Sequence, residues 1–366
     1  MIKKDVKRNT YYFVVSNRNG YPKQIKRSGF KTKREAVIAK NNMLYEINKG
    51  LYVHNSKMGM DELLQKWMKK KKREVQETTL STYEVLVKKH ISPYFKGKSI
   101  QSIKPITIEG FYDHLYDESN LSGTSVQKVH QLLKGCFDYA KKMELIAKSP
   151  LESIDRPKRD SSEVEVWDKE EVRLFLEKTQ DDPFHVAYLL GAIEGMRMGE
   201  VLGLRWKDID IESKTLCIRQ TLTFDGKKLK PGAKNKSSQR TIGLTNETVD
   251  RLKNHKAQQD TIKEEFGSAY QDMDLVVCTS LGTPVNPSNL RRSFNRNIKT
   301  LGMKKIRFHG LRHSHATICL SLNVHPKIVS ERLGHSDIRV TLNTYSHLLP
   351  SIQNKAVDQI SQAIFG

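Results

Sequence analysis

The sequence contains few cysteines, and none of them belongs to a paired motif. The four cysteines lie far apart along 366 residues, and no two of them form a Cys-x-x-Cys pair. This spacing argues against a disulfide framework and against a zinc ribbon. We therefore expect reduced thiols in or near hydrophobic cores at Cys136, Cys217, Cys278 and Cys319.

Long hydrophobic stretches are also lacking. The longest uninterrupted apolar run extends from Val186 to Ile193, which is far too short to cross a bilayer. The first residues, Met1 to Asp5, have no apolar stretch like that of a secretory signal. We therefore expect neither secretion nor a membrane partner, and the expected location is cytoplasmic.

Acidic residues are scarce relative to basic ones. The chain holds 63 Lys plus Arg against 41 Asp plus Glu, a formal net charge of +22. The excess is uneven, because residues 1–50 alone hold 13 basic and 3 acidic residues. A basic surface can serve solubility alone. A concentrated basic patch is more typical of nucleic-acid binding, because such binding releases counterions.

The first of three segments, residues 1–55, predicts a small sheet packed on one helix. Thr10–Ser16 is β-branched and aromatic and predicts a strand, and Lys23–Phe30 predicts a second strand or two short ones, which together make a three-stranded sheet. Thr32 and Glu35 form a capping box that starts a helix ending near Lys49. A basic face on such a unit suits DNA binding.

The second segment, residues 58–155, is predicted to be entirely helical. Its expected helices are Met60–Lys72, Thr79–His90, Ile106–Tyr116 and Ser122–Met143. The lysine run Lys69–Lys72 is either a solvated helix end or a phosphate contact, and we favour phosphate contact. The basic, proline-containing run Arg156–Asp160 is expected to be a linker between domains.

The third segment, residues 163–366, is predicted to be mixed and mainly helical, with a small antiparallel sheet. Asp168 and Glu171 cap one helix, and a buried helix starts near Pro183. The strands are expected within Ile209–Thr223 and Ser237–Leu244. The predicted fold class is therefore multidomain α+β.

Two groups of residues in this third segment could take part in catalysis. In the first, Gly195-Met-Arg197-Met-Gly-Glu200, the glycines allow a tight turn that brings Arg197 into a cleft, and Glu200 could hold its guanidinium. Alone, an Arg–Glu pair of this kind is more often structural.

The second group contains His309-x-x-Arg312, Leu-Gly-His335 and Tyr345. At the start of a helix, His309 and Arg312 face the same way. A tyrosine is a poor nucleophile near neutral pH unless cationic neighbours and a proton acceptor activate it. Two arginines such as Arg197 and Arg312 can hold the non-bridging oxygens of a phosphodiester and stabilise the charge added in the transition state.

Other interpretations of these residues are open. His309, His313 and His315 could bind a metal, but there is no His-Glu-x-x-His arrangement and no paired cysteine nearby. We expect His313 and His315 to pack or to support other side chains. The stretch Val324–Gly334 mimics a helix-turn-helix, although a helix that stops at Gly334 and places the next histidine in a cleft explains it better.

Taken together, the motifs resemble the tyrosine recombinase (integrase) family, especially the integrases of phages and conjugative transposons. Arg197 resembles the family's arginine box, His309-x-x-Arg312 its His-x-x-Arg box, and His335 its second histidine. Tyr345, ten residues after His335, stands at the usual spacing of the family's nucleophile. The resemblance covers the whole chain, and four boxes in the same order make it specific.

The resemblance also implies a lysine on a β-hairpin between the first two boxes. We place it at Lys236, with Lys234 as the alternative, just before the predicted strand that begins at Arg240. One departure is Gly310, where the family commonly has aspartate. We expect modest structural consequences and no loss of chemistry from this glycine.

The implied chemistry is cleavage and rejoining of DNA through a 3′-phosphotyrosyl link, which releases a 5′ hydroxyl. Tyr345 attacks the phosphate, the arginines clamp it, Lys236 acts as general acid, and the histidines donate hydrogen bonds or move protons. No metal, ATP or nucleotide cofactor is needed, in agreement with the absence of a Walker motif. The implied catalytic set is Arg197, Lys236, His309, Arg312, His335 and Tyr345, with Glu200 in support.

The resemblance further implies three domains and several partners. The domains would be an arm-type DNA-binding domain (1–55), a helical, SAM-like core-binding domain (58–155) and a catalytic domain (163–366). The partners would be double-stranded DNA with core and arm attachment sites, three further copies in a homotetramer, a directionality factor and a host DNA-bending protein. The apolar tail positions between Ile352 and Ile364 are expected to dock on a neighbouring subunit, although they could pack on their own domain.

Three rival functions remain open at this point. A non-catalytic DNA-binding regulator would have no use for the tyrosine. A metal-dependent nuclease would be inhibited by EDTA. A type IB topoisomerase shares the chemistry and would relax DNA without exchanging strands.

Overall fold

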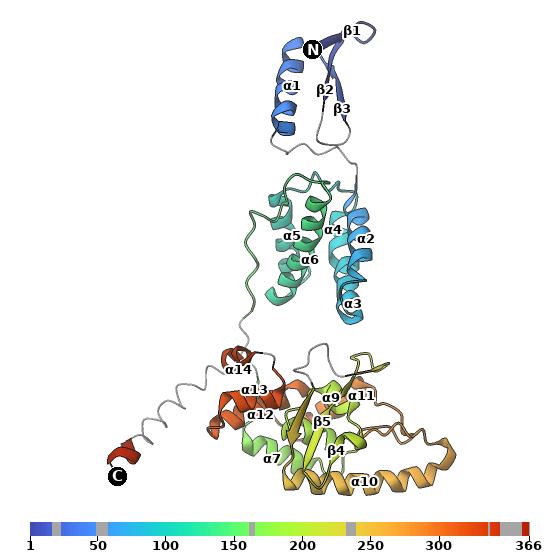
Figure 1. Ribbon diagram of the computed structural model, residues 1–366, viewed down its shortest axis with the longest axis vertical. Coiled ribbons are helices and arrows are strands. Elements are labelled where there is room, and N and C mark those ends of the chain that lie inside the picture. The colour runs from blue at the N-terminus through green and yellow to red at the C-terminus, as the bar shows by residue number, and fades with distance from the viewer. Residues whose placement is uncertain are drawn as a thin grey trace. The chain divides into compact units, whose positions relative to one another are not determined.

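The computed structural model describes residues 1–16, 23–48, 58–160, 165–231, 239–335, 337–344 and 361–365 (Figure 1). The chain divides into two compact units, Met1–Ser162 and Glu163–Gly366. The fold is mixed α and β, as the sequence predicts: an N-terminal antiparallel sheet with one helix, a helical region, and a C-terminal region with small sheets.

The N-terminal sheet has three antiparallel strands in the order β1-β2-β3, and helix α1 packs against it. The elements are β1 (Ile2–Asp5), β2 (Thr10–Ser16), β3 (Gln24–Phe30) and α1 (Lys33–Asn48). Residues 24–30 form one strand and not two. The third strand of the sheet is instead the short Ile2–Asp5, which the sequence analysis missed because it contains a single apolar residue. The Thr32 hydroxyl accepts the Glu35 N–H as predicted, whereas the Glu35 carboxylate accepts the N–H of Lys31.

The helical region of the first unit has its own core, built around Trp67, Phe111 and Phe137. Its elements are α2 (Met60–Lys71), α3 (Glu77–Leu86), the π-helical segment η1 (Val87–Ile91), α4 (Ser92–Phe95), α5 (Pro105–Asp117) and α6 (Gly123–Lys142). The predicted helix ending at His90 therefore continues through a π-helical turn into α4.

The basic run after this region, predicted as a linker, is held against α6. The Asp160 carboxylate accepts the N–H groups of Gly123 and Thr124, at 3.1 and 3.2 Å. The Gln127 amide donates to the carbonyl of Pro157 at 2.9 Å. The chain therefore stays on the helical region as far as Asp160, which caps the start of α6.

The second unit combines helices with two small antiparallel sheets, β4-β5-β8 and β6-β7. Its helices are α7 (Lys169–Lys178), α8 (His185–Ala192), α9 (Met198–Gly203), α10 (Asn246–Phe266), α11 (Pro287–Thr300), α12 (Phe308–Ser321), α13 (Pro326–Leu333) and α14 (Ile338–Thr344). Its strands are β4 (Ile209–Asp210), β5 (Thr215–Ile218), β6 (Gln220–Leu222), β7 (Leu229–Pro231) and β8 (Arg240–Gly243). Residues 361–365 are helical and exposed.

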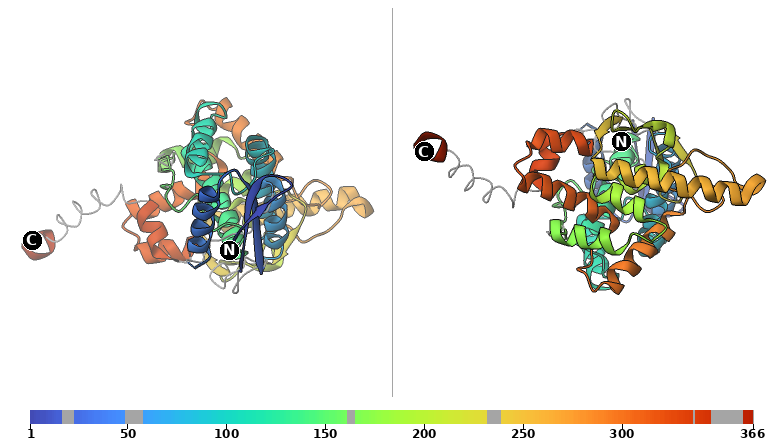
Figure 2. Two further views of the ribbon diagram at one scale, coloured as in Figure 1. Left: turned by 90° about the horizontal axis from the view of Figure 1, so that it is seen from above. Right: turned by 90° about the horizontal axis from the view of Figure 1, so that it is seen from below.

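An aromatic cluster holds the start of α12 in place. Phe308, the first residue of α12, packs edge-on against Phe294, which also contacts Trp167. The Trp167 N–H donates to the hydroxyl of Ser314 at 2.8 Å and fastens the beginning of the unit to α12. Much of α10 lies outside this core: its buried residues all fall in its first two turns, and its carboxyl-terminal half projects away in both views of Figure 2.

No helix among the described residues is long and apolar enough to span a bilayer.

Candidate active site

A tight turn after α8 delivers Arg197 to the site. Gly195 adopts a left-handed conformation with φ +66°. A Cβ there would lie 2.7 Å from Cδ2 of His315, so both the backbone angle and the space require glycine. Arg197 then caps the start of α9, while Gly199 lies within that helix. Of the two motif glycines, Gly195 is therefore the one that makes the turn.

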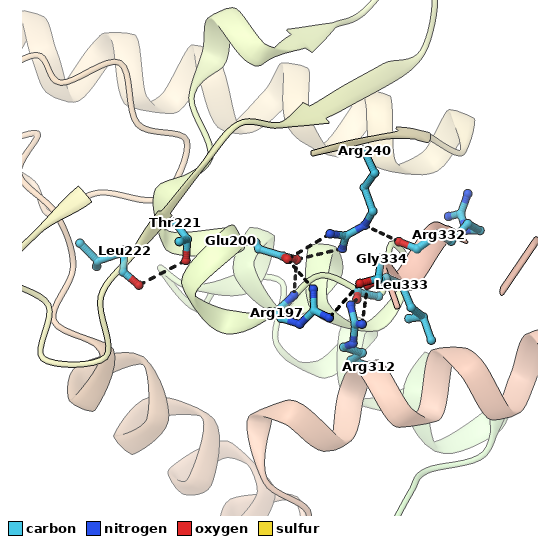
Figure 3. Close-up of polar contacts among 10 residues, drawn as sticks. Arg197, Glu200, Thr221, Leu222, Arg240, Arg312, Arg332, Leu333 and Gly334 are labelled. Carbon is cyan, nitrogen blue, oxygen red and sulfur yellow. Dashed lines mark hydrogen bonds and ion pairs between the residues drawn. The ribbon is translucent and has the colours of Figure 1, made fainter. Parts of the chain in front are cut away.

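Glu200 holds two arginines at once. Its carboxylate accepts Nη1 of Arg197 at 2.8 Å and the Arg197 backbone N–H at 2.9 Å. The same two oxygens accept Nη1 and Nη2 of Arg240, from β8, at 3.0 and 2.9 Å. The predicted pair of Glu200 with Arg197 is thus present, and a second, buried arginine joins it (Figure 3).

The two arginines keep Glu200 ionised. Burial by itself would raise the pKa of this carboxyl group, but the hydrogen bonds and charge of Arg240, together with Arg197, outweigh it. The pKa of Glu200 falls to about 2. Glu200 is therefore a fixed negative charge over the whole physiological pH range.

The carboxyl end of α13 gathers three arginines from three different elements. Arg240 Nε donates to the carbonyl of Arg332 at 2.6 Å, Arg312 Nη2 donates to that of Leu333, and Arg197 Nη2 donates to that of Gly334 at 3.3 Å. Figure 3 shows these side chains converging from α9, α12 and β8 on the end of α13. The carbonyl groups left over at a helix end, and the negative end of its dipole, both favour cations there.

His335 follows directly from this helix end. Gly334 ends α13 in the left-handed conformation, φ +64°, as the sequence predicts. The N–H of His335 then bonds back to the carbonyl of Ser330, and His335 Nδ1 lies 2.8 Å from Oγ1 of Thr341 in α14. These contacts fix the imidazole beside the arginines.

Arg312 and His309 lie one turn apart at the start of α12. Arg312 is only 2% exposed, and its Nη1 donates to the carbonyl of Gly195 at 2.7 Å. His309 is exposed at the surface and its ring contacts that of His313 edge-on. By contrast with Arg312, the Arg197 side chain is 38% exposed and is therefore accessible to solvent.

The two predicted histidines are held in the neutral form. Although His309 still reaches solvent, desolvation by the protein around its ring, followed by the charges of nearby His313, Arg312 and Arg197, lowers its pKa to about 4. Partial burial and three arginines lower the pKa of His335 to about 4 as well. At neutral pH both rings are therefore uncharged in the free protein.

A second buried carboxylate lies behind the site. Glu194 is fully buried, accepts Nη2 of Arg332 at 2.8 Å and also accepts the Thr248 hydroxyl at 2.9 Å. Arg332 Nη1 donates to the carbonyl of Gly243 at 3.1 Å, so this arginine ties α13 to β8. Burial outweighs these partners and raises the pKa of Glu194.

Three of the predicted residues lie outside the described residues. These are Tyr345, Lys236 and its alternative Lys234. The described part brings the other four together, namely Arg197, His309, Arg312 and His335, with Glu200 beside them. Of the predicted tail contacts, Ile364 is described and exposed, and the other apolar positions lie outside the described residues.

Sequence reasoning missed Arg240. It stands at the start of a strand, with its partners Glu200 and Arg332 forty and ninety-two residues away. No local spacing could have signalled this contact. Gly310, the departure from the family pattern, is buried near Ile306, and a Cβ there would lie 3.0 Å from that side chain.

Among the described residues, no group of three or more His, Cys, Asp or Glu side chains could hold a metal ion. The lysines at the end of α2 are exposed or partly exposed, and two of them contact other side chains. Lys71 pairs with Glu74 at 2.7 Å and Lys70 lies over the ring of Tyr139. Phosphate contact by this run stays a prediction.

Comparison with protein families gives three matches along the chain. The model described as "Phage integrase family" matches residues 166–351, just over half of the chain. "Phage integrase, N-terminal SAM-like domain" matches residues 60–116, and "Arm DNA-binding domain" matches residues 1–47.

Individual proteins are similar over most of the chain. A "Tyrosine recombinase XerC-like" protein of Caldanaerobacter subterraneus subsp. tengcongensis is 31% identical over 352 residues, which cover 90% of each chain. The structure of the Tn1549 transposon integrase with transposon right end DNA matches with a TM-score of 0.69 and 20% identity, over 83% of this chain and 100% of that one. A lambda integrase tetramer bound to a Holliday junction matches with a TM-score of 0.59 and 17% identity, over 92% and 95%. The two structural matches show a shared fold.

Proposed function

Since this chain belongs to the phage integrase family of tyrosine recombinases, enzymes that cut and rejoin DNA, we propose that it is the site-specific recombinase of a mobile element. The observation that carries the proposal is the arginine cluster at the carboxyl end of α13. It fixes Arg197, Arg312 and His335 next to one another, just before the chain reaches Tyr345.

In the proposed reaction, the phenolic oxygen of Tyr345 attacks the phosphorus of one DNA strand. The P–O bond to the 5′ oxygen breaks, and the phosphate then joins the 3′ end of the cut strand to Tyr345. Lys236 gives a proton to the leaving 5′ oxygen. The 5′ hydroxyl of another strand then attacks the phosphotyrosine and restores a phosphodiester. Bond energy is conserved, so the cycle needs no external energy source.

The arginines would stabilise the charge that develops on the phosphate. Arg197 is partly exposed and can donate to a non-bridging oxygen, whereas Arg312 is buried beside it and adds positive charge from a site of low dielectric constant. Neutral His309 and His335 can accept a proton or donate a hydrogen bond, which suits transfer to and from the tyrosine oxygen. Glu200 would keep Arg197 in place.

We propose that the chain has three domains: residues 1–55 bind arm-type DNA sites, residues 58–155 bind the core site, and residues 163–366 carry out catalysis. Separate hydrophobic cores support the division of the first unit, one around Phe13 and one around Trp67. Two DNA-binding regions on one chain would allow it to bridge two DNA segments. Because the substrate is DNA, we propose a cytoplasmic location.

The active assembly is proposed to be a homotetramer on two DNA duplexes, and the matched lambda integrase structure, a tetramer bound to a Holliday junction, supports this proposal. The apolar tail would dock on a neighbouring subunit. Deletion of residues 352–366 should then abolish pairing of two sites while leaving binding to one site intact. A directionality factor and a host DNA-bending protein would complete the reaction.

The test uses nicked duplexes tiled across the DNA that flanks the gene on both sides. A nick beside the cleavage site lets the short fragment with the freed 5′ hydroxyl diffuse away. Rejoining is then impossible, and the covalent adduct is trapped. We expect an adduct with the wild type, in EDTA and without ATP, and none with Tyr345→Phe. A wild type that forms no adduct on any duplex would overturn the proposal.

This assay, together with a test for relaxation of a supercoiled plasmid, separates the rival functions. Cleavage that EDTA abolishes would indicate a metal-dependent nuclease. Relaxation of supercoiled DNA without exchange between two sites would indicate a topoisomerase. Specific binding with no adduct would indicate a regulator.

A further inference from the structure

Arg240 makes an unusual set of contacts for a residue at the start of a strand. Its side chain is 6% exposed. Two of its nitrogens bond to the two oxygens of Glu200, and Nε bonds to the carbonyl of Arg332 at 2.6 Å. A forked pair with a carboxylate fixes both distance and orientation. All three of its guanidinium nitrogens bond to protein oxygens, so Arg240 is placed to hold other groups of the site.

The second observation is the complete use of the carbonyl groups at the end of α13. Those of Ser330 and Glu331 accept backbone N–H groups, of His335 and Gly334 respectively, at 3.0 and 2.9 Å. The next three carbonyl groups accept Arg240, Arg312 and Arg197 in turn. Leu333 is buried and its two neighbours are partly buried, and a buried carbonyl without a partner costs about 1–3 kcal/mol, so each of these arginines helps to stabilise the row.

The third observation is that Arg240 reaches Arg197 by two routes. One passes through Glu200, which both arginines share, and the other through adjacent carbonyl groups on α13. Arg240 therefore links β8 to α9 and to the helix that precedes His335. Removal of its guanidinium would leave Glu200 and the end of α13 each short of a partner.

We propose that Arg240 is a positioning residue for DNA cleavage, which sets the places of Arg197 and of the end of α13 without touching the substrate. This inference rests on the function proposed above.

The direct test compares Arg240→Met with Arg240→Lys. Methionine keeps the volume and loses all three hydrogen bonds, whereas lysine keeps the charge and loses the fork. Displacement of a catalytic group by about 1 Å can cost about a hundredfold in rate. We expect adduct formation to fall roughly a hundredfold in Arg240→Met and less in Arg240→Lys, with affinity for the same duplex within about threefold of wild type.

A pair of glycine variants tests the same contact without changing Arg240. A Cβ on Gly334 would lie 2.9 Å from Nη1 of Arg240 and 3.0 Å from its Cδ, whereas a Cβ on Gly302 would meet nothing within 4 Å. The two glycines have nearly the same backbone angle, φ +64° and +61°. Both alanine variants have a side chain at nearly the same positive φ, and Gly334→Ala also displaces the Arg240 guanidinium, so we expect a larger loss of cleavage in Gly334→Ala than in Gly302→Ala.

A pH profile separates positioning from general stability. The charged groups facing Glu200 are Arg197 and Arg240, and Arg312 and His335 stand beside these arginines. Without Arg240, burial of the carboxylate is opposed by one arginine instead of two, and the pKa of Glu200 must rise. The cleavage rate of Arg240→Met, relative to wild type, should therefore drop further as the pH is lowered from 8 to 5.

The double variant Glu200→Gln/Arg240→Met completes the test. Its cleavage rate should be no lower than that of the worse single variant, because both changes break one unit. Additive losses, or an Arg240→Met enzyme that cleaves like wild type with an unchanged pH profile, would overturn the inference. If Arg240→Met does not fold, Arg240→Lys and the glycine pair decide.

Failure of the proposed function would look different. In that case the wild type itself forms no adduct. Unfolding of Arg240→Lys and wild type in urea, followed against pH, still reports whether Arg240 holds the pKa of Glu200 down.

Discussion

Two helices of this protein end among basic side chains, and they use them in different ways. At the end of α13, three arginines donate to consecutive carbonyl groups, and two of the three, Arg240 and Arg312, are buried. At the end of α2, Lys69, Lys70 and Lys71 form the last turn, half of the Lys70 side chain is exposed, and the pairing is with Glu74.

The difference lies in what each kind of cation can do. Arginine offers a rigid, planar fork that fixes geometry, whereas lysine carries a mobile point charge that adds to a general positive field. The end of α13 therefore holds groups in place for chemistry. The end of α2 is suited to attract a polyanion without orienting it.

The largest effect is expected from a substitution that keeps the positive charge of a buried arginine but loses its planar, forked hydrogen-bond donors. Arg312→Lys should lower the rate of adduct formation on the nicked duplex by roughly 10²–10³-fold, because lysine cannot bond to Gly195 and Leu333 at once. Binding measured by fluorescence anisotropy should change little. Arg307→Lys, an exposed arginine at the start of the same helix, is the matched control, and an equal loss there would refute the distinction.

The next effect concerns the turn that brings Arg197 to α13. Gly195→Ala should destabilise the fold by about 2–5 kcal/mol, since left-handed strain adds to a collision with His315. Gly302→Ala, at φ +61° with open space around its Cβ, should cost only about 1–2 kcal/mol of strain. Urea unfolding measures both, and equal values would show that the packing around Gly195 adjusts freely.

Acid should weaken the arginine cluster through Glu200. Its folded pKa of about 2 lies below the ordinary 4.5, so its stabilising effect is complete above pH 4.5 and is lost as the pH falls towards 2. The stability advantage of wild type over Glu200→Gln should shrink by about 1.4 kcal/mol per pH unit below 4.5.

Glu194 supplies the control for this titration, because its pKa is raised instead. Wild type should lose stability relative to Glu194→Gln as the pH rises above 4.5. Slopes of the same sign in both variants would contradict the assigned pKa directions.

The smallest effect is expected at α2. Replacement of Lys69, Lys70 and Lys72 by glutamine should weaken DNA binding and reduce the salt dependence of log K by up to about 0.9 per lost phosphate contact. The cleavage rate at saturating DNA should stay the same. The charge-matched control is the replacement of Lys253, Lys256 and Lys263 on α10, and a fall in saturated cleavage specific to α2 would place these lysines in the chemistry.

Local signals in the sequence predicted much of the fold. The capping residues Asp168 and Glu171 mark the start of α7, and Gly334 ends α13 as expected, because each acts within a few residues of its partner. The order and spacing of four motif residues predicted that they belong to one site, and the structure brings them together: Arg197, His309, Arg312 and His335. The roles that the family resemblance implies for them stay predictions.

Contacts between distant segments could not be predicted in this way. Arg240 meets Glu200 only after the sheet and α9 have packed, and Asp160 caps α6 from thirty-seven residues away. Strand β1 was missed because Ile2 is the one apolar residue in it. In each case the information lies in tertiary packing and not in a period or a motif.

The most direct test of the account is to identify the amino acid that carries the DNA. The adduct trapped on a nicked duplex would be digested with protease and nuclease, and the modified peptide would be sequenced by mass spectrometry. We predict a nucleotide joined through its 3′ phosphate to the side chain of Tyr345. A nucleotide on any other residue, or a 5′ linkage, would contradict the mechanism.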